Sequence, residues 1–90
     1  KMTKIEFNDL FDLLCYGHDA NISIIGQRYF LEWCTNGLII YPMKKDSGKK
    51  ITTICGNNKN EIVNKLFDYE FIPGKSINTC YQEFLVLDIE

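Results

Sequence analysis

The chain has 90 residues, of which 46% are apolar and 13% aromatic, and its formal net charge is −2. This length and composition predict one folded domain with a modest hydrophobic core, and they exclude a disordered tail. The small negative charge excludes an acidic mimic of nucleic acid, and its sign is wrong for a general nucleic-acid binder.

The first residues set our expectations for processing and location. Lys1 precedes Met2, so we interpret Lys1 as the remnant of an expression tag on a single domain that spans 1–90. Acidic residues such as Glu6 and Asp9 interrupt the first apolar positions, which is unlike a secretory signal. No apolar run approaches the roughly 18 residues that a membrane span needs. We therefore expect a cytoplasmic protein without a membrane segment.

Residues 4–16 predict an N-terminal helix. Thr3 and Glu6 have the spacing of a capping box, and Gly17 is placed to end the helix. Between these ends, apolar residues recur at the spacing of one buried helix face. They are Phe7, Leu10, Phe11, Leu14 and Cys15.

Residues 21–43 predict a three-stranded antiparallel meander, because two tight-turn signals interrupt an apolar, β-favouring run. We place two-residue loops at 26–27 and 36–37, so that Trp33 pairs with Ile40. Because side chains alternate along a strand, one face then carries a set of residues that we expect the helices to cover. These are Ile22, Ile24, Tyr29, Leu31, Trp33, Leu38 and Ile40.

The second face of the predicted meander is also largely apolar. It carries Ile25, Phe30, Cys34, Ile39 and Tyr41. An antiparallel sheet with one wet face normally alternates apolar with polar residues, so this face predicts a cover. The cover is the C-terminal segment, a second copy of the chain or a different protein.

The remaining chain predicts mixed elements. After the meander we expect a polar hairpin loop, a fourth strand at about 51–55 and a second helix over about 58–70. The stretch 71–75 predicts a turn, followed by a third helix over about 76–85 and a short terminal strand over 86–90. The fold class is therefore α+β, with an N-terminal helix, an antiparallel meander of three to four strands, and two C-terminal helices before the terminal strand.

Three short stretches carry a resemblance to known proteins: 7–14 (FNDLFDLL), 17–20 (GHDA) and 71–77 (FIPGKSI). In them the chain resembles small uncharacterised single-domain proteins of Gram-positive bacteria and their phages. Those proteins share an ending of the form Phe/Ile-x-Gly-Lys-Ser/Thr-Leu before an amphipathic helix, and Pro73 replaces the usual acid before the glycine. The resemblance implies a small α+β domain of bacterial or phage origin and brings no activity with it.

The chain contains four cysteines, Cys15, Cys34, Cys55 and Cys80, and one histidine. The cysteines do not form the C-x-x-C pairs of zinc ribbons, and without an export signal a disulfide framework is not expected. Each lies in an apolar-patterned segment. We therefore expect four buried, reduced thiols and no bound metal or cofactor.

Two motifs have some similarity to functional sites. His18 follows Cys15 by three residues, but Cys15 belongs to the buried helix face and no group is placed to orient the imidazole ring. Residues 74–76 (GKS) lack the first glycine and the preceding strand of a phosphate loop, so they predict a turn and a helix cap. We therefore expect no catalytic residues and a protein that is not an enzyme.

Three functions remain as hypotheses. The leading one is a non-enzymatic protein-interaction module that uses the second face to bind a protein partner or to form a homodimer. An alternative is nucleic-acid binding through the basic hairpin at Lys44, Lys45, Lys49 and Lys50. The third is a phage- or mobile-element-encoded inhibitor of a host defence system, of which anti-CRISPR proteins are one example. It is based on small size and the lack of catalytic residues.

Overall fold

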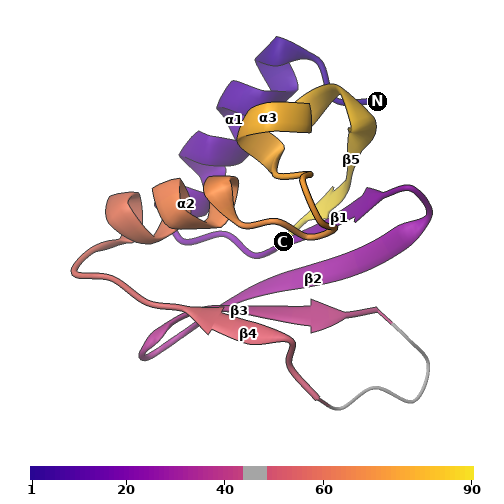
Figure 1. Cartoon of the computed structure of the whole chain (residues 1–90). Coiled ribbons are helices and arrows are strands. Elements are labelled where there is room, and N and C mark those ends of the chain that lie inside the picture. Colours follow the sequence, from indigo (N-terminus) through magenta and orange to yellow (C-terminus); the bar gives the residue numbers. More distant parts are fainter. Residues whose placement is uncertain (44–48) are drawn as a thin grey trace.

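The computed structural model describes residues 1–43 and 49–90, and it confirms the α+β class. The elements are α1 (Lys4–Cys15), β1 (Ala20–Ile24), β2 (Gln27–Cys34), β3 (Gly37–Pro42), β4 (Thr52–Ile54), α2 (Lys59–Asp68), α3 (Ile77–Cys80), the 3₁₀-helix η1 (Tyr81–Glu83) and β5 (Phe84–Ile89). In the described residues, five strands form one antiparallel sheet in the order β4-β3-β2-β1-β5. The helices of the same residues lie on one side of this sheet (Figure 1).

The caps of α1 agree with the sequence prediction. Thr3 Oγ1 accepts a hydrogen bond from the backbone N–H of Glu6 over 3.1 Å, and Glu6 Oε1 accepts one from the N–H of Thr3 over 2.8 Å. At the other end Gly17 has a φ of 102°, which places it in the left-handed region that favours glycine. Its N–H donates to the carbonyl of Leu14 over 2.9 Å. The capping-box and glycine signals therefore define both ends of the helix.

The hydrophobic core lies between the helices and one face of the sheet. Leu10 and Leu14 of α1 are fully buried, as are Leu66 and Phe67 of α2. The fully buried apolar sheet residues are Ala20, Ile22, Ile24, Leu31, Leu38, Ile40 and Phe84. Burying each large aliphatic side chain contributes about 1.5–3 kcal/mol, so this layer is the main source of stability. The predicted core face is confirmed.

The turn between β1 and β2 lies at 25–26, one residue earlier than predicted, because Ile24 pairs with Gln27. Ile25 has a φ of 48° and Gly26 a φ of 73°, the positive signs that a type I′ turn requires. The glycine thus takes the second turn position, and the isoleucine takes a conformation that branched side chains rarely adopt.

The turn between β2 and β3 is also one residue early, at 35–36, because Cys34 pairs with Gly37. Gly37 is a strand residue here, and a Cβ on it would collide with the carbonyl oxygen of Ile54 in β4. Gly37 therefore allows β3 and β4 to approach each other closely, and it is not part of the turn. Moving a two-residue turn by one position shifts the pairing between the two strands by two residues. Residues two apart along a strand point to the same face, so both corrections leave the residues predicted for each face unchanged.

The third helix is much shorter than predicted. The Ser76 N-cap is confirmed, with a capping box to Thr79, but α3 ends at Cys80 and the chain enters β5 at Phe84. β5 pairs with β1 along its length, and Leu87 is the extra residue of a β-bulge in this pairing. The backbone hydrogen bonds that β1 offers on its outer side outweigh the helical spacing of the apolar residues.

Candidate functional site

The candidate site is the sheet surface turned away from the helices, which we call the open face. It carries Asn21, Ser23, Arg28, Phe30, Glu32, Cys34, Ile39, Tyr41, Thr53 and Leu85. The C-terminal segment does not cover it, because β5 extends the sheet at its edge beside β1. Within residues 1–43 and 49–90, no element lies over this face (Figure 1). Of the three covers that the sequence predicts, the tail of the same chain is therefore excluded.

Four of the five predicted interface residues share the open face. Phe30 and Tyr41 are direct partners across β2 and β3, and their rings stack with centroids 6.3 Å apart and planes 22° apart. Ile39 is the next open-face residue of β3, and Cys34 is the last residue of β2. Phe30, Ile39 and Tyr41 are half-buried, whereas Cys34 is exposed. The fifth residue, Ile25, lies in the turn at the end of the sheet and is 63% exposed.

Sequence reasoning missed further apolar residues on this side. Met43 donates its N–H to the carbonyl of Arg28 over 3.0 Å, and Ile51 donates to that of Ile40 over 2.7 Å, so strand pairing continues past β3 and before β4. By alternation both side chains fall on the open face, and both are exposed. Leu85 is exposed as well, opposite Ser23. The β-favouring sequence FLVLDI at 84–89 could have predicted that Leu85 lies in a strand.

Polar groups are placed unevenly on the open face. On β2, Arg28 and Glu32 flank Phe30 at alternate positions, so opposite charges lie on either side of the aromatic ring. In the described part of the chain, two buried side-chain oxygens have no hydrogen-bond partner, Oδ1 of Asn21 and Oγ1 of Thr53. Asn21 and Thr53 both belong to the open face. The surface is therefore apolar at its centre, with one charge of each sign beside the apolar residues.

The Cys15–His18 pair does not have the properties of an activated nucleophile. The His18 ring donates through Nδ1 to the carbonyl oxygen of Glu90 over 3.2 Å. Burial raises the pKa of the Cys15 thiol, and the nearby charge of Asp12 raises it further. A raised pKa keeps the thiol protonated at neutral pH, whereas a nucleophilic cysteine needs the thiolate.

The cysteines are four free thiols, but the prediction that all are buried is wrong, because none of them is fully buried. Cys34 and Cys55 are exposed, while Cys15 and Cys80 are partly buried. Cys34 is exposed because it ends β2 on the open face, and Cys55 because it follows the short edge strand β4. Among the residues that the structure describes, no group of three or more His, Cys, Asp or Glu is placed to hold a metal ion.

The described lysines of the predicted hairpin and of the Gly-Lys-Ser turn lie in different surroundings. Lys44 and Lys45 of the predicted hairpin lie outside the described residues, and Lys49 and Lys50 are exposed. In the Gly-Lys-Ser turn, the ammonium of Lys75 binds Glu83 over 3.0 Å, and this hydrogen bond raises the pKa of Lys75 and lowers that of Glu83. Lys75 is therefore engaged in an ion pair.

Comparisons of this chain with protein-family models, with curated proteins and with solved structures give no match. Across the described ranges, no helix has the length and apolar character to cross a bilayer. The open face is therefore interpreted from its own residues.

Proposed function

We propose that this chain is a protein-interaction module, not an enzyme, and that its open face binds the open face of a second copy. The observation that carries the proposal is the stacked Phe30–Tyr41 pair, at the centre of an apolar sheet surface that no described element covers. Removing apolar surface from water contributes about 25 cal/mol per Å², so such a surface favours association. The raised pKa of the Cys15 thiol supports the choice of a binding role over nucleophilic catalysis.

A second copy fits this surface because the charges on β2 are self-complementary. Arg28, Phe30 and Glu32 project from the same side of the strand. In the proposed dimer, a two-fold axis lies between the two open faces, parallel to the sheets and perpendicular to β2, and passes beside Phe30. It reverses the direction of β2 between the copies. It places Arg28 of one copy opposite Glu32 of the other, with the two Phe30 rings in contact. This is the geometry of an isologous interface, in which one patch pairs with itself.

Light scattering coupled to size exclusion tests the proposal over a range of protein concentrations. We expect the wild-type chain to form a dimer and the variants Phe30→Glu and Tyr41→Lys to be monomers, because each places a charge in the apolar contact. Tyr16→Lys is the matched control, since Tyr16 is 82% exposed at the end of α1, away from the open face. It should remain a dimer.

Charge exchange tests the symmetry of the contact separately. Arg28→Glu and Glu32→Arg should each weaken the dimer, because each single change places like charges opposite one another across the axis. The double variant should restore it. A wild-type chain that stays monomeric at millimolar concentration, or a Phe30→Glu variant that still dimerises, would contradict the proposal.

A further inference from the structure

The outer side of β5 is a free sheet edge. β5 pairs with β1 on one side, and on the other the N–H of Met2 donates to the carbonyl of Phe84 over 2.7 Å. Beyond that contact, within 1–43 and 49–90, no backbone group bonds to the outer side of residues 85–89. The opposite edge, β4, has three residues and follows Lys50, a residue type that discourages strand addition. β5 is therefore the edge open to another strand.

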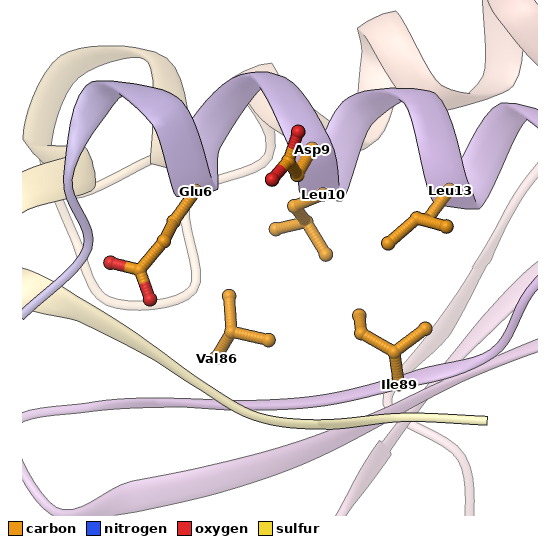
Figure 2. A pocket seen from close by; sticks show the side chains of 6 residues that line it. All are labelled: Glu6, Asp9, Leu10, Leu13, Val86 and Ile89. Carbon is orange, nitrogen blue, oxygen red and sulfur yellow. The ribbon is translucent and has the colours of Figure 1, made fainter.

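A hollow of about 220 Å³ lies between α1 and this edge (Figure 2). Leu10 and Leu13 point into it from the helix, and Val86 and Ile89 point toward them from β5. The remaining lining residues are acidic and come from α1. They are Glu6 and Asp9. The hollow thus has an apolar interior beside an open strand edge, with two carboxylates in its lining.

These carboxylates are not paired with a cation within the residues that the structure describes. Glu6 Oε1 accepts the N–H of Thr3 in the helix cap, and in the described part of the chain neither Glu6 nor Asp9 forms an ion pair. An apolar hollow with negative charge in its lining complements a side chain that has an aliphatic stem and a cationic head. Lysine and arginine are such side chains.

We propose that the β5 edge and the hollow together bind an extended segment of another protein in which lysine or arginine alternates with apolar residues. The backbone of the segment pairs with β5, and its side chains on the helix side enter the hollow. A second copy is a poor occupant, because pairing two β5 strands would bring Glu6 and Asp9 of both copies to one seam. This site is separate from the open face and does not depend on it.

Peptide binding to the ¹⁵N-labelled protein tests the proposal by NMR. The probe is an acetylated and amidated nine-residue peptide that alternates valine and lysine. We expect the probe to shift the amide signals of Leu13 and Val86 and to slow hydrogen exchange within residues 85–89, because a paired strand protects edge amides. Asp9→Lys should weaken peptide binding about fivefold, because it turns the attraction between Asp9 and the lysines of the peptide into repulsion. Asp9→Asn should weaken binding by less, because it only removes that attraction.

Three controls make the outcome specific. Asp12→Lys carries the same change on an exposed residue of α1 outside the hollow, so binding should stay within about twofold of wild type. A peptide with glutamate in place of lysine should bind Asp9→Lys better than wild type. Phe30→Glu, on the open face, should leave probe binding unchanged.

Several results would overturn the proposal. A peptide methylated on alternate backbone nitrogens cannot pair as a strand, and equal binding by this peptide would exclude strand addition. Protection of residues 85–89 that rises with protein concentration without peptide would identify a second copy as the occupant. Loss of binding in Phe30→Glu would place the peptide on the open face. Absence of binding at millimolar probe would also end the proposal.

Discussion

The indole N–H of Trp33 donates a hydrogen bond to the carbonyl oxygen of Leu14 over 3.0 Å. This bond joins the last turn of α1 to β2. A second link is close by, because the carboxylate of Asp19 accepts the backbone N–H of Trp33 over 2.9 Å. The end of the helix is therefore held to the sheet by one aromatic side chain and by the residue that precedes β1.

Replacing Trp33 by phenylalanine should lower the free energy of unfolding by about 1 kcal/mol through loss of this hydrogen bond. The effect is moderate because the carbonyl of Leu14 keeps the N–H of Gly17 as a donor. Urea unfolding followed by circular dichroism measures the change. Lys59, whose ammonium lies 5.4 Å from the Trp33 ring, provides the control. Lys59→Met should cost less than Trp33→Phe, and equal costs would assign the effect to the cation–π contact.

Ile25→Asn should stabilise the chain by about 1 kcal/mol, because asparagine tolerates the positive φ that isoleucine resists. The side chain of Ile25 is 63% exposed, so little burial is lost. Thermal and urea unfolding both measure the gain. Ile25→Val is the matched control, since valine keeps the branched Cβ and should bring no gain. A loss of stability in Ile25→Asn would show that the isoleucine contributes contacts that outweigh its strain.

Gly37→Ala should destabilise the fold by about 3 kcal/mol, because the added Cβ meets the Ile54 carbonyl and must displace β4. Gly26→Ala is the comparison. Gly26 also has a positive φ, but a Cβ there has nothing within 4 Å, so only the conformational cost of about 1 kcal/mol applies. The two unfolding curves, measured side by side, separate strand approach from backbone conformation. Equal losses would refute the close-contact explanation.

Alkylation of Cys15 should depend on pH differently in the folded and the unfolded chain. Burial raises the thiol pKa first and the charge of Asp12 second, so the folded protein should react only at higher pH than the chain in urea. The same shift makes this thiol stabilising below its unfolded pKa, and that stability is lost as the pH rises through the folded pKa. Mass spectrometry of iodoacetamide-treated peptides gives the profile.

The variant Asp12→Asn completes that measurement. Removing the carboxylate should move the folded Cys15 profile part of the way back toward the profile in urea. Identical folded and unfolded profiles would contradict the assigned effect of burial.

The sheet was the most predictable part of the fold. Alternation alone separated Ile22 and Ile24, which face the helices, from Phe30 and Tyr41 on the open face. Both turns lie one residue earlier than predicted, because Gly26 takes the second turn position instead of the first and Gly37 lies in β3 instead of in the turn. Gly37 instead leaves room for a neighbouring strand, which depends on where β4 passes. Such a requirement is tertiary and has no local sequence signal.

The C-terminal region was less predictable because its local spacing favoured the wrong element. Ile77, Cys80 and Phe84 follow a helical period, yet the chain leaves the helix before Phe84 and pairs with β1. The candidate site inherits this error, since Leu85 joins the open face only as a strand residue. Whether the C-terminal segment covered the open face depended on its path in three dimensions. A pattern of residues along the chain does not specify that path.

The pairing of β5 with β1 also orders the events of folding. The contacts among β1, β2, β3 and β4 join neighbouring segments, whereas those of β1 with β5 span most of the chain. Closing so long a loop is slow in comparison with forming a hairpin. We expect a late species in which the meander is formed and β1 still has a bare outer side. That side would be where the folding chain is most open to misassembly, and docking of β5 would end the exposure.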